Sequence, residues 1–201
     1  ILARECRVVL FVSTLKYDYH VKHFASEHVI IEKTPPATSP YLESKLNLFS
    51  LNNLHTNTIR IKIHHNYFDE GGLLSKYLKL ALWHIGRFQI LHRALRFLYL
   101  RTPDYSFDTF FEKYNPALVF APNIIANEDF RMIKAARKRG IVSVGMPKGW
   151  DNLSAKTFFL IFPNYLLLQN ETMRREAIEH YNFPPDRIFV VGFPNFDIYA
   201  H

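Results

Sequence analysis

Short apolar runs alternate with amphipathic segments through the second half of the chain, and this alternation predicts strands and helices in turn. The runs Ala117–Ala121, Ile141–Gly145 and Tyr165–Gln169 are typical of buried strands, whereas Asn127–Gly140 and Glu171–Tyr181 have helical periodicity. Two further elements of the same kinds are a short helix at Phe107–Tyr114 and a last strand at Arg187–Gly192. Because a strand, a helix and a strand in succession form a parallel unit with a right-handed crossover, these patterns predict a parallel sheet.

The first half of the chain carries a similar alternation. Cys6–Thr14 is an almost unbroken apolar run that predicts a first strand buried on both faces, and Leu15–Ala25 would connect it to a second strand at His28–Glu32. The prolines of Thr34–Ser39 predict an extended linker. Thr58–Ile63 alternates apolar and polar residues with period two, which predicts an edge strand or a strand with one solvated face.

The longest helical pattern runs from Gly71 to Arg101, as one helix or as a helix pair broken near Gly86. Its apolar residues recur every three or four positions and predict one apolar stripe, made of Leu74, Leu78, Ala81, Ile85, Phe88, Leu91, Leu95 and Leu98. Lysines and arginines lie mostly off that stripe, interleaved with Trp83 and Phe97. Such a basic side is either the solvated face of a globular helix or a surface for anionic lipid headgroups.

Taken together, these elements predict an α/β fold with a Rossmann-like, doubly wound and mainly parallel sheet. No Gly-x-Gly-x-x-Gly turn follows the first predicted strand and no Walker lysine loop occurs, so these two nucleotide-binding signatures are absent. The single cysteine, Cys6, excludes an internal disulfide or a cysteine zinc cluster and favours a reducing compartment. No uncharged apolar run of about 18 residues is present, so the sequence predicts no transmembrane helix.

The net charge indicates which kind of partner the chain binds. The formal net charge of +7 favours an anionic one, such as a nucleotide, a phosphorylated sugar or an acidic lipid headgroup. Nucleic-acid binding would also account for the charge, but no motif of that class occurs, and we expect no nucleic-acid partner.

One loop concentrates the residue types that carry chemistry. Gly145–Asn152 follows a predicted strand directly and brings together glycine, proline, lysine, aspartate, asparagine and tryptophan. Ligands of open α/β sheets bind outside the carboxyl ends of the strands, so the loop is the candidate site. The alternative is a structural loop in which Trp150 covers the edge of the core and Asp151 caps the next helix.

The stretch from about Asn115 to Tyr199 resembles the end of the N-terminal domain in glycosyltransferases of the GT-B fold. The branch it resembles is related to capsule and wall polysaccharide transferases, and its neighbours include the CDP-glycerol glycerophosphotransferases and the sugar-nucleotide 2-epimerases. The matching segments are Pro116–Val119, Lys148–Lys156, Leu168–Ala177 and Val191–Asp197.

This resemblance implies that residues 1–192 are an acceptor-side, Rossmann-like N-terminal domain. Gly192-Phe193-Pro194 would be its exit, and residues 193–201 would begin the connection to a C-terminal domain that holds most of the nucleotide. We therefore expect this chain to be part of a longer protein and to be inactive alone. The first 100 residues match no family pattern.

The function that the resemblance implies is group transfer in surface polysaccharide biosynthesis. The donor would be a nucleotide-activated sugar or CDP-glycerol, the acceptor a saccharide or a lipid-linked molecule, and no metal or other cofactor would be needed. The expected location is cytoplasmic, peripheral on the inner face of an anionic membrane. The alternative is a non-catalytic Rossmann-like binding domain that docks on a membrane or a protein partner through its basic amphipathic helix.

Within the loop, Asp151 is the candidate catalytic residue, as the base that takes a proton from an acceptor hydroxyl. A cap on the following helix is its alternative role and is the one the local sequence favours. Lys148 and Lys156 would bind a phosphate or pyrophosphate, or would simply be solvated. Trp150 would stack on a sugar ring.

Further candidate residues lie in or near this loop. Gly149 and Asn152 complete the substrate-binding loop, and Asn170 and Glu171 follow the next predicted strand. Asn170 is also a good N-cap, the role we favour for it, at a helix end that attracts phosphate. Asn123 is a weaker candidate of the same kind.

Two histidines are candidates by position. His20 and His23 follow the first predicted strand, where transferases of the resembling fold often place a catalytic base. No His-Glu-x-x-His or similar ligand spacing occurs, so we expect no metal site.

Overall fold

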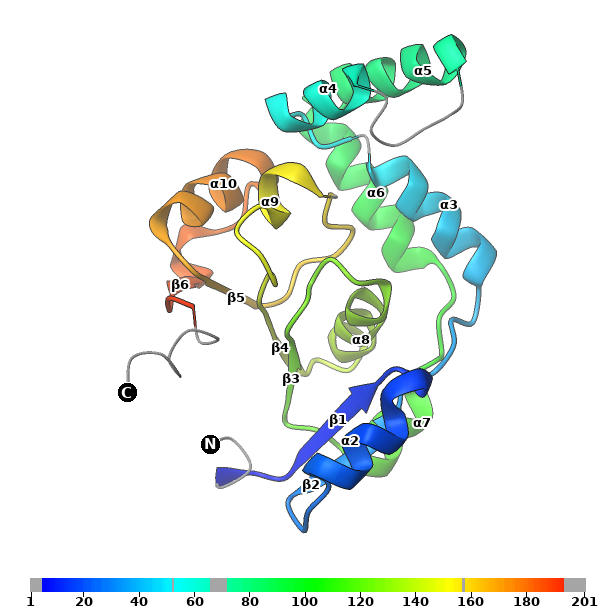
Figure 1. The fold of residues 1–201 in the computed structure, drawn as a ribbon, viewed down its shortest axis with the longest axis vertical. Helices are drawn as coiled ribbons and strands as arrows, with labels where there is room; N and C mark the ends of the chain where they lie inside the picture. The colour runs from blue at the N-terminus through cyan, green and yellow to red at the C-terminus, as the bar shows by residue number, and fades with distance from the viewer. Residues whose placement is uncertain (1–4, 52, 66–71, 157, 194–201) are drawn as a thin grey trace. The chain divides into compact units, whose positions relative to one another are not determined.

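The computed structural model describes residues 5–51, 53–65, 72–156 and 158–193. The chain divides into two compact units, Ile1–Pro36 and Ala37–His201, whose elements are drawn in Figure 1. The expectation of one domain over residues 1–192 stays a prediction.

The first unit is a single strand–helix–strand motif. Strands β1 (Val8–Val12) and β2 (Val29–Lys33) pair in parallel, and they are connected by η1 (Thr14–Lys16) and α2 (Tyr17–Phe24). The predicted strands, their connection and their parallel pairing are thus confirmed. The expectation that the first strand is buried on both faces is wrong, because only Val12 of β1 is buried. A two-stranded sheet with one short helix offers little apolar surface to bury it.

The second unit contains a four-stranded parallel sheet in the order β3-β4-β5-β6. Its strands are β3 (Leu118–Ala121), β4 (Val142–Gly145), β5 (Tyr165–Leu168) and β6 (Ile188–Val190). Helix α8 (Asn127–Lys138) connects β3 to β4, and α10 (Glu171–Tyr181) and η2 (Pro185–Arg187) connect β5 to β6. The chain is therefore mixed α/β with parallel strands in two small sheets, and these four strands run in consecutive order without the reversal that a doubly wound sheet contains.

The four-stranded sheet buries one face. Val119 and Ala121 of β3 are buried, whereas Leu118 and Phe120, which alternate with them, are exposed. Strands β4 and β5 alternate in the same way, with Val142 and Tyr165 exposed, whereas Phe189 and Val190 of β6 are both exposed. The short apolar runs thus form strands as predicted, but at most every second side chain is buried.

Within the described part of the second unit, five helices precede this sheet. They are α3 (Pro40–Leu51), α4 (Asn57–His64), α5 (Gly72–Ile85), α6 (Gln89–Arg101) and α7 (Asp108–Tyr114). The predicted break near Gly86 and the short helix before β3 are confirmed. Gly86 is required at the break, because a Cβ atom there would lie 2.1 Å from the backbone oxygen of Asn53.

Residues Thr58–Ile63 were predicted as a strand, and this prediction is wrong, because they lie in α4. Thr56 caps the helix by accepting a hydrogen bond from the amide of Ile59 at 3.3 Å. Ile59 and Ile63, one helical turn apart, are buried, whereas Ile61 is 53% exposed. Isoleucine at every second position fits both periods over so short a segment, and the capping threonine favours the helix.

The stripe predicted along α5 and α6 is also different in the structure. Leu95 is buried, but Leu74, Leu78 and Ile85 are exposed, with 74% of the Leu74 surface accessible. Helix α5 instead buries Trp83, whose Nε1 donates to the backbone oxygen of Thr56 at 2.9 Å. The indole therefore sets which side of α5 faces α4, and the leucine stripe is left on the outside.

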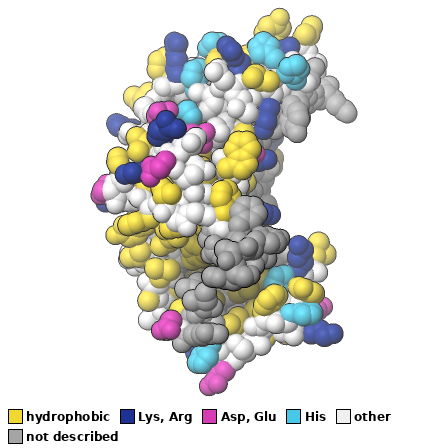
Figure 2. Space-filling model, turned by 60° about the vertical axis from the view of Figure 1, so that its left-hand side comes forward, with side chains coloured by type: hydrophobic (Ala, Val, Ile, Leu, Met, Phe, Trp, Pro, Cys, Tyr) yellow, Lys and Arg dark blue, Asp and Glu magenta, His cyan; other side chains and the backbone are white. Residues whose placement is uncertain are grey.

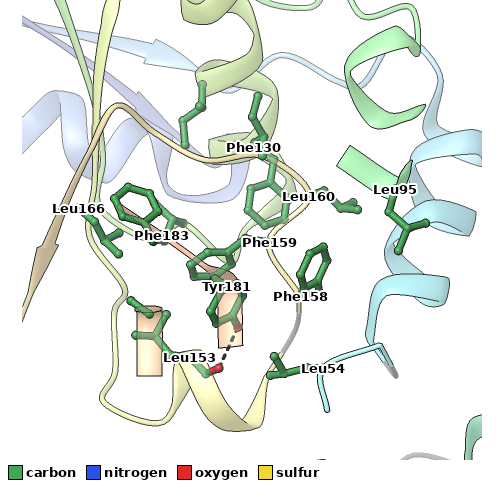
Figure 3. Packing of buried hydrophobic residues seen from close by; sticks show 14 of the residues in the cluster. Leu54, Leu95, Phe130, Leu153, Phe158, Phe159, Leu160, Leu166, Tyr181 and Phe183 are labelled. Atoms are coloured by element: carbon green, nitrogen blue, oxygen red, sulfur yellow. Dashed lines mark hydrogen bonds between the residues drawn. The ribbon is translucent and has the colours of Figure 1, made fainter. Parts of the chain in front are cut away.

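The core of the second unit is centred on a segment without regular structure. This segment lies between β4 and β5 in the sequence, and four of its residues are almost completely buried: Phe158, Phe159, Leu160 and Ile161. Figure 3 shows Phe158 and Phe159 packed around Tyr181 of α10, with ring centroids 5.8 and 4.5 Å from that of Tyr181. Residues of α6, α8 and α10 join the same cluster, so the segment connects helices that are distant in sequence.

Candidate functional site

The candidate loop lies at the carboxyl edge of the four-stranded sheet. Because the strands are parallel, the segments that follow β3, β4 and β5 all leave the sheet at this edge. The segment after β4 leads into α9 (Asn152–Ala155), and Figure 1 shows α9 beside α10. The topology therefore places Asn123, Lys148 and Asn170 at one edge, as the sequence predicts.

Gln169 joins two of these segments. Its side chain is buried at the end of β5, and its Nε2 donates to the backbone oxygens of Pro147 at 3.1 Å and Lys148 at 3.3 Å. Its Oε1 is buried and has no hydrogen-bond partner among the residues that the structure describes. The amino-acid sequence does not indicate this role, because a glutamine that ends a strand has no signature beyond its position.

Asn152 organises the loop from within. Its carboxamide is oriented so that the hydrogen-bonding groups around it are satisfied. In this orientation the Asn152 oxygen accepts hydrogen bonds from the backbone amides of Lys148 and Gly149 at 3.1 Å each. Its nitrogen donates to Asp151 Oδ1 at 3.2 Å. Asn152 is buried, and a Cβ atom on Gly149 would lie 3.0 Å from the Asp151 carboxylate. Both residues therefore shape the loop, and their predicted contact with substrate stays a prediction.

Three side chains from other helices hold α9 in place. Each donates a hydrogen bond to one of three successive backbone oxygens: Tyr181 to Leu153 at 2.8 Å, Thr56 to Ser154 at 2.6 Å and Lys62 to Ala155 at 2.7 Å. The first of these bonds is drawn in Figure 3. A helix as short as α9 cannot satisfy its last carbonyl groups alone, so α4 and α10 supply the donors.

The structure does not support the capping role of Asp151. No capping bond forms from its side chain, because its Oδ1 faces the Asn152 nitrogen and its Oδ2 lies 3.3 Å from Lys156 Nζ. Lys62 belongs to the same charged group. Burial lowers the pKa of Lys62, the Lys156 ammonium lowers it further, and the Asp151 carboxylate raises it.

The exposed part of the loop consists of four side chains. Lys148 and Lys156 are exposed, and the Asp151 carboxyl group is partly accessible between Lys156 and Asn152. Trp150 is 68% exposed, so it does not cover the edge of the core. The loop thus presents an indole, two ammonium groups and a carboxylate to solvent, on a backbone held by the hydrogen bonds of Gln169 and Asn152.

Asn170 and Glu171 have local roles at the start of α10. Asn170 caps the helix by accepting from the amide of Met173 at 2.9 Å, so the favoured capping role is confirmed. Glu171 Oε2 lies 3.6 Å from Arg174 Nη1 on the surface of the same helix. Gln169, the preceding residue, connects this helix start to the Lys148 backbone.

A carboxylate that the sequence analysis did not single out lies at the end of β3. Asp129, in the first turn of α8, accepts a hydrogen bond from the amide of Asn123 at 2.8 Å. Burial raises the pKa of Asp129 to about 6, although the Asn123 amide lowers it. The acidic first turn of α8 was recognised as a helix start, and only burial distinguishes Asp129 from Glu128 beside it.

The two candidate histidines lie in the first unit, on α2. Each ring donates from Nδ1 to a backbone oxygen four residues earlier: His20 to Lys16 and His23 to Tyr19, both at 2.7 Å. His23 is exposed and His20 is half-buried, and the proposed role as a base stays a prediction. Among the described residues, no group of three or more histidine, cysteine, aspartate or glutamate side chains is placed to hold a metal ion.

The chain was compared with models of protein families, with curated proteins and with solved structures. None of these comparisons gave a match. The geometry of the loop is therefore the basis for any functional assignment. No helix within the described residues has the length and apolar character needed to cross a membrane.

Proposed function

We propose that this chain is the acceptor-side, Rossmann-like N-terminal domain of a transferase with GT-B architecture. The enzyme moves a sugar or glycerophosphate group from a nucleotide-activated donor to a saccharide or lipid-linked acceptor. The observation that carries the proposal is the exposed group of Lys148, Trp150, Asp151 and Lys156 on a loop fixed at the carboxyl edge of a parallel sheet. This edge is the part of open α/β sheets that binds ligands.

Each of the four side chains suits one part of such a reaction. The exposed indole of Trp150 offers an apolar face for a sugar ring. The Lys148 and Lys156 ammonium groups are compact positive charges that stabilise phosphate oxygens. Asp151, held between Lys156 and Asn152, is the base for the acceptor hydroxyl.

The acceptor hydroxyl oxygen attacks the anomeric carbon of the donor sugar, or the phosphorus of a glycerophosphate group, while the bond from that atom to the nucleotide phosphate breaks. The electron pair leaves with the nucleotide, and the hydroxyl proton passes to the Asp151 carboxylate. In this proposal the second domain of the enzyme holds the nucleotide, and this chain positions the acceptor.

Two features of the fold support the architecture. The consecutive parallel order β3-β4-β5-β6 is compatible with a Rossmann-like α/β fold. The fixed loop leads from β4 into α9, so the backbone beneath the exposed side chains is preorganised before ligand binds.

The test is a transfer assay with the full-length protein on a panel of nucleotide sugars and CDP-glycerol with saccharide acceptors. Asp151→Asn keeps the shape of the side chain and removes the base, so we expect the rate to fall by about 10²–10⁴-fold. Asp186→Asn, at an exposed aspartate of η2, is the matched control and should leave the rate unchanged. A fully active, folded Asp151→Asn variant would show that this carboxylate is not the base.

A further inference from the structure

Helix α5 presents an apolar stripe to solvent. Leu74, Leu78 and Ile85 lie along one side of the helix, Tyr77 lies beside them, and all four are exposed. Phe88, in the turn to α6, extends the same apolar surface. The opposite side of the helix buries Trp83 against α4, so the stripe is not the face with which α5 packs on the domain.

The helices around this stripe are positively charged throughout. Residues 57–65 and 72–101 contain eight lysines and arginines and no aspartate or glutamate. Asp69 and Glu70 lie between these ranges, outside the described residues. Arg60, Arg87 and Arg93 are exposed. Figure 2 shows lysine, arginine and histidine side chains mixed with hydrophobic ones at the top, where α4 and α5 lie.

We propose that the α5 stripe docks on an anionic lipid bilayer, with α5 lying in the plane of the headgroups. An interfacial helix buries its apolar side about 5–10 Å into the bilayer boundary while basic residues contact anionic headgroups. The exposed leucines supply the apolar side, and the exposed arginines of α4, the α5–α6 turn and α6 supply the basic one: Arg60, Arg87 and Arg93.

Charge complementarity favours an anionic bilayer over a second copy of the chain as the partner of the stripe. Two copies meeting through the stripe would bring two wholly cationic groups of helices together, and like charges that face each other oppose association. An anionic bilayer instead attracts each nearby lysine or arginine. The proposal does not rest on the transferase function, because none of its residues belongs to the loop that follows β4.

The experiment is co-sedimentation of the 201-residue chain with vesicles. One set is phosphatidylcholine with about 30% phosphatidylglycerol, and the other is phosphatidylcholine alone. We expect binding to the anionic vesicles that weakens as sodium chloride rises from about 0.05 to about 0.5 M. The variant Leu74→Gln/Leu78→Gln should bind at least about 100-fold more weakly, which is about tenfold for each leucine removed from the bilayer.

Matched variants separate the stripe from general effects. Leu15→Gln/Leu118→Gln removes two exposed leucines elsewhere and should bind like the unmodified chain. Arg87→Glu/Arg93→Glu should bind at least about tenfold more weakly, whereas Lys22→Glu/Arg175→Glu, with the same change in net charge, should have a smaller effect. All substituted positions are exposed, and circular dichroism checks that each variant is folded.

Three results would overturn the proposal. The first is no binding of the chain to anionic vesicles at low salt. The second is equal binding by Leu74→Gln/Leu78→Gln and the unmodified chain. The third is a dimer in sedimentation equilibrium that this leucine variant abolishes, because a second copy would then be the occupant of the stripe.

Discussion

Substituting Gly86 by alanine tests how closely the α5–α6 turn approaches the rest of the second unit. A Cβ atom at residue 86 would lie 2.1 Å from the backbone oxygen of Asn53, whereas an ordinary contact begins at 3.4 Å. The two backbones would have to separate by about 1.3 Å, and no side-chain rotation can relieve the overlap. The same oxygen accepts a hydrogen bond from the buried ring of His92 at 3.2 Å.

The cost of Gly86→Ala follows from these two contacts. Overpacking costs about 1–3 kcal/mol, and loss of the buried hydrogen bond adds about 1–3 kcal/mol. We therefore expect the free energy of unfolding to fall by about 2–6 kcal/mol, with a drop in Tm of about 2–4 °C for each kcal/mol. Urea and thermal denaturation measure both quantities.

The control is Gly140→Ala, which changes a glycine with open space around it. Gly140 has φ of +68°, so alanine there is strained, at about 1–2 kcal/mol, but meets no atom within 4 Å. If Gly86→Ala destabilises the chain less than Gly140→Ala does, the close approach at Asn53 is refuted.

Three further substitutions test buried polar groups by urea denaturation. Burial raises the pKa of Asp129 from 3.8 to about 6, so the folded state holds this proton more tightly than the unfolded state. The free energy of unfolding therefore falls as the pH rises from 3.8 to 6. Asp129→Asn should be more stable than the unmodified chain by up to about 3 kcal/mol at pH 7, and equal to it near pH 3. Burial lowers the pKa of Lys134 from 10.5 to about 8, so stability should rise by up to about 3 kcal/mol between pH 8 and 10.5 and Lys134→Met should lack this rise. Tyr181→Phe should lose about 1–3 kcal/mol, because it removes the hydroxyl that donates to the buried Leu153 oxygen. A pH-independent difference at Asp129 or Lys134, or a neutral Tyr181→Phe, would contradict these assignments.

The regular elements near the sheet could be predicted because their signals are local. Helix α10 begins and ends where predicted, since Asn170 caps its first turn and the chain at Asn182 turns left-handed, with φ of 54°. The acidic start and basic end of α8 are equally local. Propensity and capping act over a few residues, so sequence alone contains that information.

The errors arose where tertiary contacts decide. Ile59, Ile61 and Ile63 fit a strand until the packing of Ile59 and Ile63 is known. The α5 stripe has the period of a core face, yet the hydrogen bond from Trp83 to Thr56 turns the other side of the helix inward. The burial of Phe158–Ile161 without regular structure depends on helices far away in sequence.

For the candidate loop, the sequence predicts the position but not the contacts that hold it. The position of Lys148 to Lys156 at the carboxyl edge follows from the strand pattern, and the structure places it there. Gln169 as the connection beneath the loop, and the burial of Asn152, depend on distances that the sequence does not contain.

The most direct test of the proposed function is quenching of tryptophan fluorescence in the full-length protein by acrylamide, with and without ligand. This chain has two tryptophans, of which Trp83 is buried and Trp150 exposed, so Trp150 dominates its quenching, and Trp150→Phe identifies the Trp150 signal. Saccharide acceptors, nucleotide sugars and CDP-glycerol are titrated in turn. We expect at least one saccharide acceptor to protect Trp150 from acrylamide saturably. If no member of the panel changes the quenching of Trp150, the loop is not the acceptor site.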